Sequence, residues 1–330
     1  MNINNNLIKK ARAEIERIHG PLPHPQRSYI VLMSPRSGSN LLCVHLEKIG
    51  FGRPMEGFHF NPKALQRKFG WPAEFNNSFE HIRYALDYGT LGGVFGLKLS
   101  WVEFELFLRE ARQVLEPTGF SLNDGELLEL FFPDAAYIHL KRRNKVKQAV
   151  SYAKAMQNGI WQVDAENNDD YKKHLLPAQY DRDHIESLFD NLLVYDLAWE
   201  RLLRNYSIPG LVMWYEDLAR DYVVKMKEIY AYLGIDREEV IAPPLKKQSD
   251  ELSQDWVQRF EMETHWLSNP DILTAMQAGD FETVHFLRTK QILRDKERKR
   301  WVEMPANRFK SIRKFAFRVR RKLSTLVGIK

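Results

Sequence analysis

The chain has 330 residues, of which 44% are hydrophobic and 28% are charged, and this composition is typical of a folded globular protein. Its single cysteine, Cys43, excludes an intrachain disulfide framework and a cysteine-rich zinc module. The net charge of +6 is uneven, because residues 281–330 hold 16 Lys+Arg against 4 Asp+Glu while the rest is mildly acidic. The basic balance therefore describes the C-terminal segment and does not indicate a nucleic-acid-binding protein.

The first part of the chain predicts a helix, a linker and a buried strand. Apolar residues recur at helical spacing over residues 5–19, and residues 20–25 are rich in proline. Residues 29–33 are a short apolar run typical of a buried strand. A loop of small residues, 34–40, follows, and then a helix that Gly50 ends.

The rest of the chain alternates strands and helices. Further apolar runs predict strands at residues 93–99, 135–140 and 211–215. Helices are predicted at roughly 76–88, 102–116, 145–158, 184–204 and 219–233. The alternation predicts an α/β fold of three layers, with a central parallel sheet flanked by helices. Because such sheets bind ligands at the carboxyl ends of their strands, we expect the site just after residues 33, 99, 140 and 215.

The strand pattern stops near residue 270, and the remaining residues predict helices on a basic background. We therefore divide the chain into an N-terminal helix and linker (1–27), a central domain (28–270) and a basic, helical C-terminal extension (271–330). There is no apolar leader, no run long enough to span a membrane and no internal repeat. These features predict a cytoplasmic protein.

The loop after the first strand predicts an anion site. Its sequence is Ser34-Pro35-Arg36-Ser37-Gly38-Ser39-Asn40. The free N–H groups at the start of a helix, an arginine and two hydroxyls together suit a phosphate or sulfate ester. A Walker ATP loop would carry Gly-Lys-Ser/Thr, and here no lysine follows Gly38. The alternative is a tight turn with a helix-capping serine.

Four blocks of sequence resemble the PAPS-dependent carbohydrate sulfotransferases, in particular the bacterial trehalose 2-sulfotransferase type. They cover residues 28–265 in the same order as in that family. The blocks are Ser34-x-Arg36-Ser37-Gly38-Ser39-x-Leu41-Leu42, Gly96-x-Lys98-x-x-Trp101, Ile138-His139-x-x-Arg142 with Gln148-Ala149-Val150-Ser151, and Gln248-x-Asp250 with Trp256-x-x-Arg259. The resemblance implies a P-loop-like fold and PAPS (3′-phosphoadenosine 5′-phosphosulfate) as co-substrate.

The resemblance also implies where the nucleotide binds. The residues expected around its 5′-phosphosulfate are Ser34, Arg36, Ser37, Gly38, Ser39 and Asn40. Arg142 and Ser151 are expected to bind its 3′-phosphate. Arg142 and Ser151 are nine positions apart, so on one helix their side chains would face opposite ways. They can converge only if Arg142 lies at the end of the strand and Ser151 lies in the helix. Lys141 and Arg143 leave the register open by one residue, and an exposed basic turn is the alternative.

The acceptor side carries the candidate catalytic groups. By resemblance, Glu56 is the general base, and the alternative is a solvated loop carboxylate. His59 is a rival base or a substrate-binding residue. Lys98 is a candidate catalytic cation that could bind a sulfuryl or phosphate oxygen or an acceptor hydroxyl. Trp101 could stack on a sugar or on the adenine, while a packing role is open for both. No metal is required in principle, because fixed cations can stabilise the developing charge, and Arg36 is counted among the catalytic residues for this reason.

The expected reaction is transfer of a sulfuryl group to a hydroxyl of a carbohydrate or glycolipid. One alternative is a P-loop-like nucleotide kinase, and another is a non-catalytic nucleotide-binding protein. The basic, amphipathic stretch 308–322 predicts a helix that lies on an anionic membrane surface or docks on the acidic body. We expect no nucleic-acid partner, and the oligomeric state is open between a monomer and a homodimer.

Overall fold

The structure is a computed structural model that describes residues 4–59, 65, 66, 70–72, 74–163, 178–246 and 250–302, without the side chains of residues 297–302. Its strands are β1 (Arg27–Met33), β2 (Thr90–Leu91), β3 (Val94–Ser100), β4 (Ala136–Lys141) and β5 (Gly210–Trp214). Its helices up to β5 include α1 (Asn5–His19), α2 (Ser39–Lys48), α4 (Ser78–Gly89), α5 (Trp101–Leu115), α6 (Asp124–Phe131), α7 (Lys145–Asn158) and α8 (Arg182–Asn205). After β5 come α9 (Tyr215–Arg220), α10 (Tyr222–Leu233), α11 (Glu251–Glu263), α12 (Pro270–Ala278) and α13 (Phe281–Val302). Short 3-10 turns lie at Glu116–Thr118 and His265–Ser268.

The strands form one five-stranded sheet in the order β2-β3-β1-β4-β5. Strand β1 pairs in parallel with β3 on one side and with β4 on the other, and β4 pairs in parallel with β5. Only the two-residue strand β2 runs antiparallel, at the edge beside β3. The carboxyl end of the central strand β1 therefore lies between the carboxyl ends of β3 and β4.

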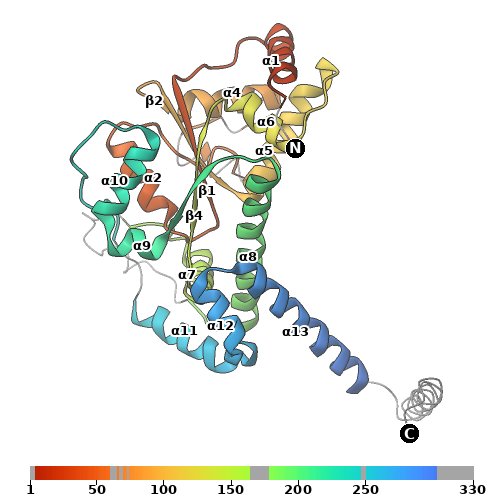
Figure 1. The fold of residues 1–330 in the computed structure, drawn as a ribbon, viewed down its shortest axis with the longest axis vertical. Coiled ribbons are helices and arrows are strands. Elements are labelled where there is room, and N and C mark those ends of the chain that lie inside the picture. The colour runs from red at the N-terminus through yellow and green to blue at the C-terminus, as the bar shows by residue number, and fades with distance from the viewer. Residues whose placement is uncertain are drawn as a thin grey trace, which may run out of the picture.

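Helices cover both faces of the sheet (Figure 1). Ile30 and Leu32 of β1 face one hydrophobic core, which they share with α1, α4, α5, α6 and the end of α8. Tyr29 and Val31 face the opposite core, which they share with α2, α9 and α10. The side chains of a strand alternate between its faces, so one apolar run supplies both cores. The predicted three-layer α/β fold is confirmed.

A third core lies beyond the carboxyl ends of the strands, where α7, α8, α11, α12 and the start of α13 pack together (Figure 1). Phe281 and Val284 of α13 are buried in this core. The division of the chain at residues 27 and 270 stays a prediction. If the C-terminal extension begins at residue 271, as predicted, it contributes buried side chains that pack against α7 and α8.

The predicted elements agree with the structure within about two residues at most boundaries. Residues 5–19 and 145–158 are helices with the predicted limits. The single helix predicted at 219–233 is instead two, α9 and α10, separated at Asp221. Helix α6 was not predicted, although Asn123 and Glu126 form a capping box at its start.

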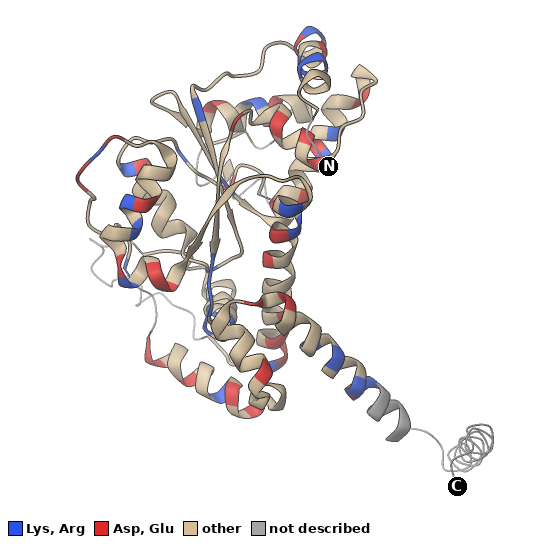
Figure 2. Cartoon of the chain, viewed as in Figure 1, with Lys and Arg blue, Asp and Glu red and all other residues tan. Residues whose placement is uncertain are grey.

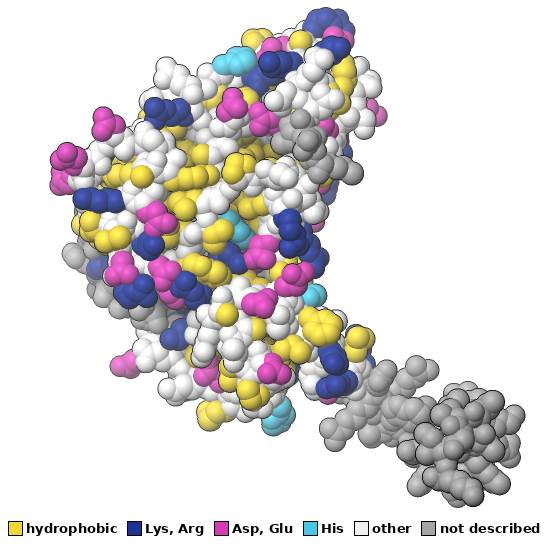
Figure 3. All heavy atoms as spheres, viewed as in Figure 1, with side chains coloured by type: hydrophobic (Ala, Val, Ile, Leu, Met, Phe, Trp, Pro, Cys, Tyr) yellow, Lys and Arg dark blue, Asp and Glu magenta, His cyan; other side chains and the backbone are white. Residues whose placement is uncertain are grey.

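The described surface carries both signs of charge (Figure 2). On the face shown in Figure 3, hydrophobic side chains gather near the middle, and Val212 of the edge strand β5 is 48% exposed. Within the described residues, no helix has the length and apolar content that crossing a membrane would need. The predicted surface helix at 308–322 lies outside the described residues.

Candidate functional site

The loop between β1 and α2 is built around two residues with positive φ. Arg36 has φ of 65° and Gly38 has φ of 87°. A β-carbon at Gly38 would lie 2.3 Å from a ring carbon of Tyr215, so both the backbone and the space require glycine there. Helix α2 begins at Ser39, directly after this turn, and its positive end faces the loop. The predicted strand–loop–helix arrangement is therefore present.

The structure brings the two predicted anion-binding clusters together. Arg36 Nε donates to Ser151 Oγ at 3.0 Å, and the Arg36 guanidinium also donates to the carbonyl of Trp161. Arg142 Nη1 donates to the carbonyl of Arg36 at 3.2 Å. The Arg142 guanidinium lies 4.8 Å above the ring of Tyr215, which also contacts Gly38. Residues that are more than 100 positions apart thus line one space.

Two positive charges lie side by side in this space. Burial and the charge of Arg142 lower the pKa of Arg36 to about 10. Among the described residues, Arg142 Nε and Ser37 Oγ are buried without a hydrogen-bond partner. Buried polar groups are normally satisfied, so such atoms next to two arginines suit an anion with several oxygens. The donor set therefore fits the phosphate groups of a nucleotide.

The structure resolves the register after β4. Lys141 pairs with Glu200, and Arg143 forms a two-pronged pair with Asp217 at 2.9 and 3.0 Å. Both flanking cations are therefore directed away from the loop, and Arg142 is the one that reaches it. Because β4 ends at Lys141 and α7 begins at Lys145, Arg142 belongs to the turn between them.

Glu56 and Lys98 meet on the other side of the loop. Met55 forms a parallel bridge to Leu97 of β3, and its carbonyl accepts from the backbone N–H of Lys98 at 3.0 Å. This pairing places Lys98 Nζ 2.9 Å from Glu56 Oε1. Lys98 Nζ also donates to Asn40 Oδ1 at 2.5 Å. Three predicted site residues from three segments are therefore in contact.

The electrostatics of this pair involve a second carboxyl group. Burial acts to lower the pKa of Lys98, but the charge and hydrogen bond of Glu56 outweigh it, so the pKa lies above its usual value. Burial, together with the nearby charge of Glu56, raises the pKa of Glu103 to about 8. Glu103 caps helix α5 and accepts from the N–H and hydroxyl of Ser100. The neutral carboxyl group of Glu103 therefore lies near the charged Lys98–Glu56 pair.

Two other predicted residues have different surroundings. Trp101 donates its indole N–H to Glu105 at 2.9 Å and packs its ring 5.0 Å from that of Trp199. These contacts favour the packing role for Trp101. His59 is partly exposed and lies three residues after the candidate base, so it stays the rival in that role.

The fourth block of the resemblance lies only partly within the described residues, because Gln248 is outside them. Asp250 caps helix α11 and pairs with Lys154 of α7 at 2.5 Å. Burial acts to raise the pKa of Asp250, but hydrogen bonds from Lys154 and from the hydroxyl and N–H of Ser253, with the charge of Lys154, lower it to about 2. This part of the block therefore joins α11 to the helix that carries Ser151.

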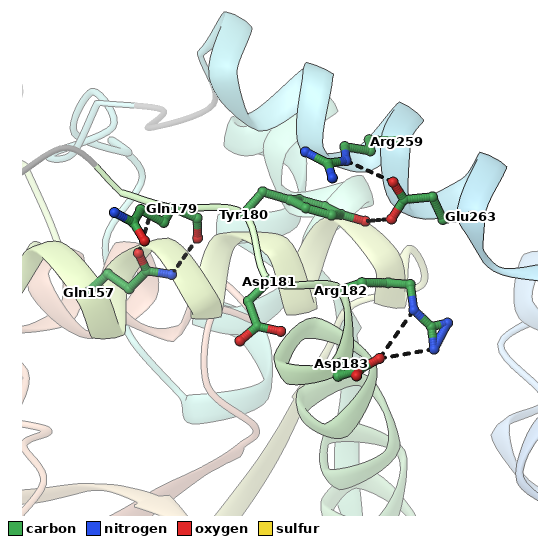
Figure 4. Close-up of a pocket in the computed structure, with 8 residues that line it drawn as sticks. All are labelled: Gln157, Gln179, Tyr180, Asp181, Arg182, Asp183, Arg259 and Glu263. Carbon is green, nitrogen blue, oxygen red and sulfur yellow. Dashed lines mark hydrogen bonds and ion pairs between the residues drawn. The ribbon is translucent and has the colours of Figure 1, made fainter.

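Trp256 and Arg259 both pack against the ring of Tyr180. Trp256 is buried with its ring edge-on to Tyr180. Arg259 lies 4.0 Å above the Tyr180 ring and pairs with Glu263, so its cation–π partner is Tyr180 rather than Trp256. Figure 4 shows Tyr180, Arg259 and Glu263 on the wall of an open pocket of about 590 Å³ between α11 and the start of α8.

Sequence reasoning gave no role to several residues at the site. Tyr215 directly follows β5, at one of the four predicted strand ends, and this position could have indicated a role at the site. Glu103 stands three residues after Ser100 in a capping-box pattern. Trp161 is 46% exposed, and its ring lies 6.0 Å from that of Tyr152. No local pattern marks Trp161, because it approaches the loop only through the turn after α7.

A mostly parallel sheet, with an anion-binding loop after its central strand and with Arg36 and Arg142 side by side at that loop, defines a P-loop-like α/β nucleotide-binding protein. The chain belongs to the Stf0 sulphotransferase family, whose model matches residues 28–263. It is therefore a PAPS-dependent sulfotransferase, and the predicted family is confirmed.

Two curated relatives resemble the chain over most of its length. The trehalose 2-sulfotransferase of Mycobacterium tuberculosis is 26% identical over 267 residues, which are 74% of this chain and 98% of the relative. That of Mycolicibacterium smegmatis is 26% identical over 262 residues, with 72% and 95% covered. Mouse sulfotransferase SULT7A1 complexed with PAP aligns at 15% identity and a TM-score of 0.37, covering 80% and 72% of the two chains.

Proposed function

We propose that the chain transfers the sulfuryl group of PAPS to a hydroxyl of a carbohydrate, with a disaccharide such as trehalose as the first acceptor to test. The observation that carries the proposal is the pairing of Arg36 and Arg142 beside the loop, with Glu56 and Lys98 on its other side. The activity named for the two curated relatives supports a carbohydrate acceptor.

The nucleotide would be held at both ends of its ribose. Arg36, Ser37, Gly38 and Ser39 would hold the 5′-phosphosulfate, where the N-terminal end of α2 adds its positive potential. Arg142 and Ser151 would hold the 3′-phosphate. The Arg36–Ser151 hydrogen bond of 3.0 Å supports this assignment, because it joins the two clusters directly.

The chemical step would divide between Glu56 and the cations. Glu56 takes the proton of the acceptor hydroxyl while the oxygen attacks sulfur, and the S–O bond to the 5′-phosphate breaks with its electron pair on the phosphate. Lys98, 2.9 Å from Glu56, favours the carboxylate form that a base needs. Lys98 and Arg36 would stabilise the developing charge on the sulfuryl oxygens. On this proposal the reaction needs no metal ion.

The test is a transfer assay with labelled donors. We expect label to pass from ³⁵S-PAPS to a disaccharide, and the rate to be unchanged by EDTA. Transfer from γ-labelled ATP would support a kinase, and nucleotide binding without either transfer would support a non-catalytic protein. A screen of disaccharides and glycolipids identifies the acceptor.

A further inference from the structure

A buried ion pair lies behind the anion-binding loop and takes no part in the proposed reaction. Lys145, the first residue of α7, pairs with Asp196 of α8, and both side chains are 0% exposed. Lys145 Nζ also donates to Gln148 Oε1 at 2.8 Å. Burying two charges is costly unless the hydrogen bonds around them are well placed, so this arrangement calls for a specific use.

The pair fixes the orientation of the Gln148 amide. A lysine ammonium group has only donors, so the amide oxygen of Gln148 must face Lys145. Its NH₂ group is then turned toward the loop, where it donates to Ser34 Oγ at 2.9 Å and to the carbonyl of Pro35 at 2.8 Å. Gln148 and Ser34 are both 0% exposed, so water does not compete for these bonds.

The orientation of Gln148 in turn directs the hydroxyl proton of Ser34. Because Ser34 Oγ accepts from Gln148, its own proton must point elsewhere. Among the described residues, none accepts a hydrogen bond from Ser34 Oγ. Ser34 and Pro35 directly precede Arg36, the first residue of the loop with positive φ, so the two bonds from Gln148 hold the start of the loop.

We infer that Gln148 is a positioning residue, through which the Asp196–Lys145 pair holds the Ser34–Pro35 segment and so sets the position of the loop that would bind the 5′-phosphosulfate group. This inference rests on the proposed role of the loop in nucleotide binding. The ligand class is the phosphate or sulfate end of the nucleotide, and the acceptor is not involved.

The decisive variant is Gln148→Glu. A glutamate keeps an acceptor for Lys145 and the size of the side chain, but it offers no N–H to Ser34 or Pro35. The carbonyl of Pro35 would then lose its donor and face a carboxylate, and Ser34 could only donate to that carboxylate. We expect the Kd for PAP to rise about 10- to 100-fold, because a displaced loop would lose one or two hydrogen bonds to a charged ligand.

Kinetics separate positioning from a merely structural role. With Gln148→Glu we expect the KM for PAPS to rise as the Kd for PAP does, with the KM for the acceptor within about twofold of wild type. Gln157→Met, an exposed glutamine on the same helix, is the matched control and should leave all three constants unchanged. A uniform loss of active protein would lower kcat alone and would contradict the inference.

A double-mutant cycle tests the coupling to Ser34. Ser34→Ala should weaken PAP binding by a similar factor, and Gln148→Glu in that background should add less than about threefold. Independent, multiplying effects would overturn the inference. Ser34→Ala changes one atom, so it carries the test even where Gln148→Glu does not fold, and unchanged PAP affinity in Ser34→Ala would overturn it too. Wild-type protein that binds no PAP would instead refute the proposed function.

Discussion

The Arg36 side chain has the most specific role proposed at the site. Its guanidinium donates to Ser151 Oγ and to the carbonyl of Trp161, and it lies beside Arg142. A fork of donors in this position can bind two oxygens of one anion, which a lysine cannot do.

Arg36→Ala should therefore lower kcat/KM for PAPS by at least about 10³-fold, because the clamp on the reacting group is lost. Arg36→Lys should recover only a small part, since it restores the charge but not the fork. Steady-state kinetics with varied PAPS measure both. Arg220→Ala, at a residue whose side chain is 66% exposed, is the control and should match wild type. Equal activity of the lysine and arginine forms would contradict a two-pronged role.

Glu56 is predicted to act on the acceptor and not on the nucleotide. Glu56→Gln should reduce kcat by about 10²–10⁴-fold, because a general base is removed. The Kd for PAP should stay within about twofold, since Glu56 pairs with Lys98 and is proposed to act on the acceptor. Turnover assays and calorimetric titration with PAP measure the two quantities. Glu47→Gln, a surface change, is the control, and if Glu56→Gln keeps full turnover, the base is His59 or water.

At the scale of single elements, helix α2 is fixed to α10 by a buried histidine. His45 contacts the hydroxyls of Tyr222 at 2.7 Å and Tyr230 at 2.5 Å. Burial, with a smaller effect of Arg237, lowers the pKa of His45 to about 4. Because α2 begins at the anion loop, this contact supports the position of the loop.

This histidine predicts a pH dependence of stability. Between pH 6.5 and 4 the unfolded chain binds a proton at His45 that the folded chain does not, so the free energy of unfolding should fall as the pH is lowered. The limit for one group is about 1.4 kcal/mol per pH unit. Urea unfolding of wild type and His45→Gln across this range measures the difference, and wild type should be the steeper. His24→Gln, at an exposed residue, should follow wild type. Parallel curves for wild type and His45→Gln would contradict the assignment.

The elements were largely predictable from the sequence, and the contacts between them were not. Apolar runs such as residues 29–33 identified the buried strands because both faces of the sheet are covered. The convergence of Arg142 and Ser151 followed from the boundary between β4 and α7. The ring of Tyr215 against Gly38 joins residues 177 positions apart, and no local pattern encodes it. The polar contacts of Gln148 behind the loop depend on packing in the same way.

At the scale of the whole molecule, α13 is fixed to the body only at its beginning. Arg288 is 7% exposed, pairs with Glu186 and Asp190, and lies 4.4 Å above the ring of Trp266. Beyond this anchor the helix extends away from the body and carries lysine and arginine (Figures 1 and 2). The described end of α13 therefore lies away from the loop between β1 and α2 (Figure 1).

Membrane binding by the basic segment, residues 308–322, can be tested independently of catalysis. If the segment lies on an anionic membrane surface, the full chain should sediment with vesicles containing about 30% phosphatidylserine and should be released by salt, because the attraction to anionic lipid is screened. A chain ending at Glu303 should stay in solution, and neutral phosphatidylcholine vesicles should recover neither form. Equal recovery of both forms on the acidic vesicles would refute membrane attachment. In that case a lower melting temperature of the shorter chain would support docking on the body.

The position of β1 in the sheet separates the two halves of the reaction. Every group proposed for the 3′-phosphate comes from the β4 side, while Glu56 and Lys98 come from the β3 side. Substitutions in residues 52–103 could therefore change which acceptor is used, while the residues that would bind the 3′-phosphate stay the same. This strand order would allow related proteins to accept different hydroxyl compounds while they keep the same residues for the nucleotide.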